Sequence, residues 1–182
     1  MIQLIRYLML LAQRPWKPAP GQPRPGPLGI RQHEFWVMPW DCDLNLHLTN
    51  GRYPAWLDLM RTRYFIELGA TPLFIKQGWR SVLASQTVTF IREIKPFAKV
   101  QVTSELLHWD RKYLYLEHKF LVAGQLHAVA IARVALLQGG RVRSLSAMLD
   151  VIHGNTRQFD APSIPDHIQA KIDLLEAQKA AS

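Results

Sequence analysis

The chain has 182 residues, of which 48% are hydrophobic and 20% are charged, and this composition suits one ordinary globular domain. A single cysteine, Cys42, excludes an internal disulfide and is typical of a reducing compartment, so we expect a cytoplasmic protein. The formal net charge is +8, but residues 1–31 hold five basic residues and no acidic one, which leaves the rest only mildly basic. This distribution, without any zinc-ligand spacing, argues against nucleic acid as a partner.

Two segments precede the main part of the chain. Residues 1–12 are apolar except at two positions and are too short to span a bilayer. We expect them to pack on the protein or on a dimer partner, or to make peripheral contact with a membrane. Residues 15–27 contain six prolines and are predicted to be an extended linker. The predicted division is an apolar segment with a Pro-rich linker (1–30), followed by one domain with a C-terminal helical extension (31–182).

A strand and a long helix are the first elements predicted in that domain. The strand covers about Glu34 to Trp40 and leads into a polar turn. From Thr49 to Leu68, apolar residues recur three and four positions apart, which predicts an amphipathic helix. Thr49 or Asn50 is expected to cap its start, and Gly69 to end it in the left-handed conformation. Opposite charges on its polar face are expected to pair: Asp58 with Arg61, and Arg63 with Glu67.

An antiparallel sheet is predicted after this helix. Its strands are expected at Ser81–Ile94, Phe97–Trp109, Tyr113–Ala123 and Leu126–Leu137. Apolar and polar residues alternate in the second and third of them, which is typical of a sheet with one covered face. Because the connections are short, we expect a meander of neighbouring strands. A last helix is predicted from about Pro165 to Ala177, with Ile168, Ile172 and Leu175 on one face. The predicted fold class is α+β.

The segment from Asp41 to Tyr53 concentrates side chains that can do chemistry. It contains two aspartates, a histidine and two asparagines, more polar groups than core packing explains. The helix that follows supplies free backbone N–H groups and the positive end of its dipole. A carboxylate beside such an end can act as nucleophile or base, while the N–H groups polarise a substrate carbonyl.

The spacing of this segment resembles the signature of hotdog-fold acyl-CoA thioesterases, in particular the 4-hydroxybenzoyl-CoA thioesterase-like branch. Asp43, His47, Asn50 and Tyr53 follow Asp41 by two, six, nine and twelve positions. The resemblance covers about residues 31–140. It implies a hotdog fold, in which an antiparallel sheet wraps round one long central helix. It also implies a homodimer or homotetramer whose active sites lie at the subunit interface.

The same resemblance implies roles for single residues. Asp43 corresponds to the family's catalytic carboxylate, which attacks the thioester or activates water. Asn50 corresponds to the position whose backbone N–H points at the thioester oxygen. Tyr53 is expected to contact substrate. His47 orients Asp43, donates to the carbonyl, binds water or is structural, and the sequence leaves these alternatives open.

Other residues carry weaker expectations. Asp41 is expected to cap a turn rather than to catalyse. Asp58 is a second candidate carboxylate, but pairing with an arginine explains it more simply. Cys42 lies between two aspartates, which are expected to raise its pKa and leave it unreactive. Leu46 stands where the family usually has glycine, and Asn45 is expected to supply a positive φ if one is needed.

A second similarity lies in the turn that contains Arg111 and Lys112. It resembles a turn that holds coenzyme A phosphates in 4-hydroxybenzoyl-CoA thioesterases, although a solvated hairpin turn is the plain alternative. We expect no metal and no redox cofactor. The resulting hypothesis is an acyl-CoA thioesterase that releases a free acid and coenzyme A. The alternative is a module that binds acyl-CoA or an acylated carrier protein without turnover.

Overall fold

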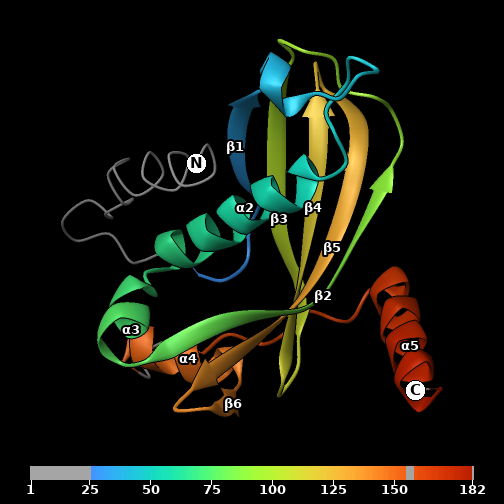
Figure 1. Cartoon of the computed structure of the whole chain (residues 1–182). Coiled ribbons are helices and arrows are strands. Elements are labelled where there is room, and N and C mark those ends of the chain that lie inside the picture. The colour runs from blue at the N-terminus through green and yellow to red at the C-terminus, as the bar shows by residue number, and fades with distance from the viewer. Residues whose placement is uncertain (1–25, 155–157, 182) are drawn as a thin grey trace.

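The computed structural model describes residues 26–154 and 158–181, and its strands form one antiparallel sheet (Figure 1). The strands are β1 (Arg31–Trp36), β2 (Trp79–Phe90), β3 (Lys99–Trp109), β4 (Tyr113–Val122), β5 (Gln125–Gln138) and β6 (Arg141–Arg143). The helices are η1 (Pro39–Asp41), α2 (Arg52–Leu68), α3 (Thr71–Lys76), α4 (Leu145–His153) and α5 (Asp166–Ala180). The strand order is β1-β3-β4-β5-β2, and β6 pairs with the end of β5.

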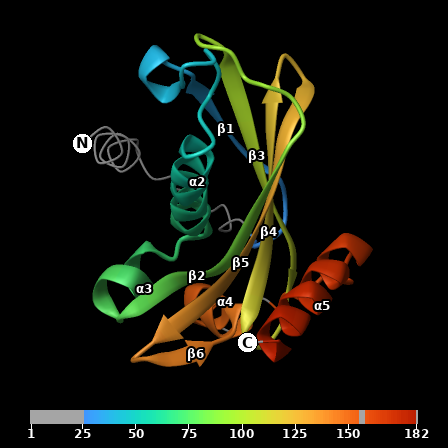
Figure 2. The ribbon, with the colours of Figure 1, turned by 45° about the vertical axis from the view of Figure 1, so that its right-hand side comes forward.

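Helix α2 lies against one side of the twisted sheet, and α5 lies on the opposite side (Figures 1 and 2). The first half of α2 packs Tyr53, Trp56, Leu57 and Met60 in a cluster with Val100, Val102 and Phe120. Its second half packs Tyr64, Phe65 and Leu68 with Leu106, Leu116 and Val134. Burial of these side chains is the main force that holds helix and sheet together. The predicted α+β class, with one long helix against an antiparallel sheet and an extra C-terminal helix, is confirmed.

The predicted end of α2 is confirmed, but the predicted side-chain cap at its start is wrong. Gly69 ends the helix in the left-handed conformation, with φ of 88°. At the other end the N-cap is Gly51, and no side chain caps the helix. Thr49 is held instead by its backbone, since its N–H donates to the Asp41 carbonyl and its carbonyl accepts from Arg52. The predicted pairs on the polar face are present: Asp58 with Arg61, and Arg63 with Glu67.

The predicted meander is correct for β3, β4 and β5 but wrong for β2. Strand β2 pairs with β5. Strand β3 pairs with β4 on one side and with β1 on the other. The connection between β2 and β3 makes its hydrogen bonds elsewhere: the Ile94 carbonyl accepts from Leu48, and the Phe97 N–H donates to the Val37 carbonyl. The connection thus crosses the end of the sheet from β2 to β3. The two strands are not neighbours and do not form a hairpin.

Burial follows the predicted alternation in β3 but not in β4. In β3, Val100, Val102, Ser104 and Leu106 are buried and the residues between them are more exposed. In β4, Tyr115 and Glu117 on the outer face are buried as well. On that face α5 buries Ile168, and its His167 lies 3.4 Å from Glu117. The expectation of one covered face therefore fails where α5 crosses the sheet.

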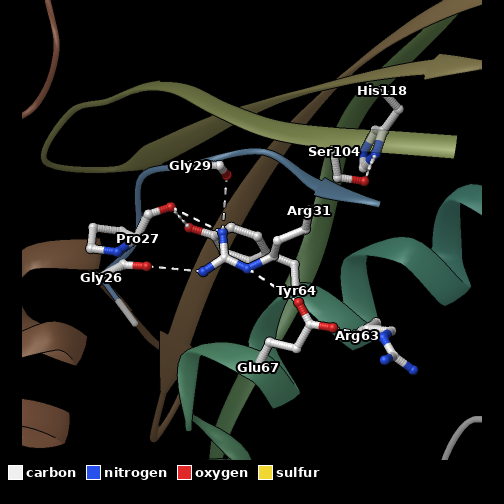
Figure 3. Close-up of polar contacts among 9 residues, drawn as sticks. All are labelled: Gly26, Pro27, Gly29, Arg31, Arg63, Tyr64, Glu67, Ser104 and His118. Atoms are coloured by element: carbon white, nitrogen blue, oxygen red, sulfur yellow. Dashed lines mark hydrogen bonds and ion pairs between the residues drawn. The ribbon is translucent and has the colours of Figure 1, made fainter. Parts of the chain in front are cut away.

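A cluster of polar contacts fastens the start of the described chain to α2 (Figure 3). The Arg31 guanidinium donates to the carbonyls of Gly26 (2.9 Å) and Pro27 (3.3 Å) and lies 3.4 Å from a Glu67 oxygen. The Tyr64 hydroxyl donates to the same Pro27 carbonyl at 3.0 Å. Residues 1–25 lie outside the described residues. The linker, the membrane or packing contact of residues 1–12, and the domain division therefore stay predictions.

Candidate active site

The polar segment after β1 folds into a tight loop around Asp41. This side chain is fully buried, its Oδ2 accepts from the Met38 N–H at 3.1 Å, and its Oδ1 lies 3.3 Å from Arg52 Nε. Its backbone carbonyl accepts from the Thr49 N–H. With both carboxylate oxygens turned inward, Asp41 ties η1 to the start of α2. The structural role expected for this residue agrees with its contacts.

Asp43 and His47 form a pair on the surface of the same loop. Asp43 Oδ1 lies 3.5 Å from His47 Nδ1, and about a third of each side chain is exposed (34% and 28%). The same oxygen accepts from the Asn45 N–H at 2.9 Å, which fixes the carboxylate as an Asx turn. The positive φ of this loop belongs to Leu46, at 57°, so the expectation for Asn45 is wrong. Leu46 takes this conformation because its N–H closes the turn onto the Asp43 carbonyl, and its side chain points into solvent.

An open pocket of about 230 Å³ lies beside this pair. It is lined by His47, Leu48, Asn50 and Tyr53, by Phe90 at the end of β2, and by Ile91, Arg92 and Glu93 directly after that strand. Three residues predicted for the site, His47, Asn50 and Tyr53, thus line one pocket. Asp43 does not line it but contacts His47, which does.

The wall formed by residues 90–93 was not anticipated from the sequence. Its carboxylate, Glu93, accepts a hydrogen bond from Lys95, which lowers the pKa of Glu93. The available signal in the sequence was the charged pair of Glu93 and Lys95 directly after a strand. Such a pair is also typical of an ordinary turn, and only the fold places residue 93 in the same pocket as residue 47.

The N-terminus of α2 opens into the pocket at Asn50. No side chain caps this helix end, and among residues 26–154 and 158–181 the Asn50 N–H has no acceptor. Pro54 in the first turn carries no N–H of its own. The N–H groups and the positive end of the helix dipole are therefore available to an oxygen atom in the pocket.

Tyr53 is a buried residue of the pocket lining. Its ring packs edge-on against Phe90, with centroids 4.9 Å apart, and lies 5.0 Å from Phe120. Burial raises the pKa of Tyr53 to about 12, so its hydroxyl is neutral at physiological pH. The residue offers an apolar ring and a neutral hydroxyl to a ligand rather than a charge.

Arg111 and Lys112 lie away from the pocket in the same chain. They occupy the β3–β4 turn, whereas the loop that holds Asp43 bonds to residues at the opposite end of β3. The length of β3 separates the two places by roughly 30 Å. In the turn, Asp110 accepts from the Lys112 and Tyr113 N–H groups, and both basic side chains are exposed. One chain therefore does not bring these two residues to Asp43.

The remaining candidates have structural partners. Asp58 pairs with Arg61, whose guanidinium also donates to the side chain of Gln86. Partial burial raises the pKa of Cys42, and Asp41 and Asp43 raise it further, as expected for an unreactive thiol. In the described part of the chain, no three His, Cys, Asp or Glu residues lie close enough to hold a metal ion. No helix among the described residues is long and apolar enough to cross a membrane.

Comparison with known proteins agrees with this geometry. Residues 37–172 match the family model described as the thioesterase-like superfamily. The chain belongs to this superfamily. A probable thioesterase of Saccharomyces cerevisiae is 28% identical over 90 residues, covering 49% of this chain and 39% of that protein. Protein THEM6 of Xenopus laevis is 23% identical over 143 residues, covering 76% and 66%. The chain thus spans less than two thirds of the length of either relative.

The fold is shared with solved thioesterase structures. The 4-hydroxybenzoyl-CoA thioesterase of Pseudomonas sp. strain CBS-3 superposes with a TM-score of 0.55 and 20% identity, covering 64% of this chain and 91% of that one. At this level of identity the likeness establishes the hotdog fold. The predicted fold family, with its 4-hydroxybenzoyl-CoA thioesterase-type architecture, is therefore confirmed.

Proposed function

We propose that this superfamily member is an acyl-CoA thioesterase and that the pocket beside Asp43 is its active site. The observation that carries the proposal is the uncapped N-terminus of α2, which opens into a pocket lined by His47, the residue that contacts Asp43. A thioester carbonyl seated there has hydrogen-bond donors for its oxygen and a carboxylate nearby.

In this mechanism the backbone N–H groups near Asn50 polarise the thioester carbonyl and stabilise the negative charge that develops on its oxygen. Asp43 either attacks the carbonyl carbon or removes a proton from an attacking water. His47 orients the Asp43 carboxylate through the contact of 3.5 Å. Cleavage of the carbon–sulfur bond releases coenzyme A as the thiol and, after addition of one water, the free acid.

The substitution Asp43→Asn tests this assignment. It keeps the size of the side chain and its acceptor for the Asn45 N–H, but removes the charge. We expect the turnover number to fall at least ~10²-fold, because a lost base or nucleophile costs about that much. Release of coenzyme A thiol from a panel of acyl-CoA substrates is the measurement. Asp58→Asn, on the neighbouring helix, is the matched control and is expected to keep its activity.

A folded Asp43→Asn protein with near-normal turnover rules out the role of Asp43. A wild-type protein that binds acyl-CoA tightly but releases no thiol from any substrate favours the alternative, a binding module without turnover.

We also propose that the protein forms at least a homodimer, either a dimer or a homotetramer. Strand β2 is one of the two edges of the sheet, and it exposes Val82, Leu83 and Phe90 by 41–48%. A long edge strand with exposed apolar side chains is a template for pairing with another copy. Phe90 also lines the pocket, so a partner on this edge would complete its wall. Light scattering at micromolar concentration tests this, and a stable active monomer contradicts it.

A cytoplasmic location stays a prediction from Cys42.

A further inference from the structure

A second pocket lies on the outer face of the sheet, under α5 and away from α2. Its volume is about 340 Å³, and it is lined by Ala84, Ser85, Tyr113, Arg133, Leu175, Gln178 and Lys179. These residues come from β2, β4, β5 and α5, which the fold brings together on the side of the sheet opposite α2 (Figures 1 and 2). No residue of the Asp43 site takes part in it.

Arg133 is the central residue of this second pocket. The residue is 6% exposed, and its guanidinium stacks on the Tyr113 ring at 3.7 Å from the centroid. Its Nε is buried and, among the described residues, has no hydrogen-bond acceptor. Arg133 Nη2 donates a long hydrogen bond of 3.4 Å to a Glu176 carboxylate oxygen. A guanidinium has five N–H donors, so this buried cation retains capacity for an acceptor in the pocket.

The strand register adds further donors on the same face. A β-bulge after Leu83 places Ser85 directly opposite Arg133, and Tyr115 lies opposite Arg133 on its other side. Directly paired residues of antiparallel strands point to the same face of a sheet. The Ser85 side chain is therefore presented on the face that Arg133 occupies. Without the bulge, the register of β2 would shift by one residue and turn Ser85 to the opposite face.

Arg133 and Lys179 both contact the carboxylate of Glu176. Lys179 Nζ lies 3.0 Å from the same Glu176 oxygen that Arg133 contacts, and the Glu176 side chain is 56% exposed. Glu176 therefore occupies only part of the donor capacity of Arg133, and its exposed position allows it to move aside.

We propose that this pocket binds the phosphate group of a small organic phosphate. An arginine fork and an ammonium group suit phosphate oxygens, and the Ser85 hydroxyl and Gln178 amide add neutral donors. The pocket is larger than a phosphate ion needs, and Leu175 with the Tyr113 ring offers an apolar surface to the organic part. Coenzyme A and an unrelated phosphate ester share this chemistry. The proposal does not depend on hydrolysis at Asp43.

Calorimetric titration of the full-length protein with inorganic phosphate and with coenzyme A tests the proposal. Lys179→Met is expected to weaken binding about fivefold, the upper range for an exposed charge, and Arg133→Met at least about tenfold. Glu176→Gln is expected to tighten binding about threefold, because it removes the competing carboxylate.

Lys171→Met, on the same helix but outside the pocket, is the matched control and is expected to change nothing. If Arg133 only fixed α5, Glu176→Gln would loosen the helix without any gain in phosphate affinity.

Two further titrations identify the source of the phosphate. Pantetheine lacks all phosphate groups of coenzyme A, and dephospho-coenzyme A lacks the 3′-phosphate. Binding of coenzyme A that is lost with either probe and weakened by Lys179→Met assigns the pocket to coenzyme A. Binding of inorganic phosphate that responds to Lys179→Met, while coenzyme A binding does not, assigns it to a separate phosphate ester. The proposal is overturned if no probe binds saturably, or if Lys179→Met and Glu176→Gln both leave every affinity unchanged.

Discussion

His118 Nδ1 lies 2.7 Å from the Ser104 hydroxyl, and both side chains are buried between the sheet and α2 (Figure 3). The two residues are paired across β3 and β4 on the face that carries the core. Burial, together with the nearby Arg61 charge, lowers the pKa of His118 to about 3. The imidazole is therefore a neutral core residue that donates to, or accepts from, one hydroxyl.

This pair predicts how stability changes with pH. Between the ordinary histidine pKa of 6.5 and about 3, the unfolded chain takes up a proton at His118 and the folded protein does not. The free energy of unfolding should therefore fall as the pH drops below 6.5, by up to about 1.4 kcal/mol per unit. Urea denaturation between pH 7 and 4 measures the slope. His118→Asn, which cannot titrate, should have a shallower slope. Equal slopes in the two proteins would show that other groups control acid stability.

Asp41 and Asp43 should separate stability from activity. Asp41→Asn removes a charge that is fully buried beside Arg52, so we expect it to destabilise the protein by about 2 kcal/mol or more. Asp43→Asn changes an exposed turn and should cost less than about 1 kcal/mol. Thermal unfolding of the two variants, beside their turnover numbers, tests this. If Asp41→Asn keeps full stability, Asp41 does not anchor the loop.

Arg111 and Lys112 are predicted to hold the nucleotide end of coenzyme A bound to another subunit, since one chain places them roughly 30 Å from Asp43. The double substitution of both residues by Ala should raise KM for acyl-CoA several-fold with little effect on kcat, because the contact is the same in ground and transition states. The effect should shrink with acyl-pantetheine and at high salt. Arg141→Ala with Arg143→Ala, another exposed basic pair, is the control. Equal losses with full-length and truncated substrates would make the turn structural.

Local sequence patterns were enough to predict most elements of the fold. The three- and four-residue spacing in α2 and the two-residue spacing in β3 depend on neighbouring residues, and Gly69 ends α2 because glycine tolerates its φ of 88°. The spacing of Asp43, His47, Asn50 and Tyr53 likewise belongs to one short segment. Its resemblance to hotdog thioesterases indicated the fold, and three of these residues line one pocket.

Tertiary structure decided which distant segments meet. The pairing of β2 with β5, the burial of both faces of β4 and the wall of residues 90–93 depend on contacts between residues far apart in the chain. No local period encodes such contacts, because many pairings satisfy the same alternation of apolar and polar residues. Arg133 is an example. In the sequence it is a lone cation in an apolar strand, and only the packing of α5 over the sheet makes it the centre of a pocket.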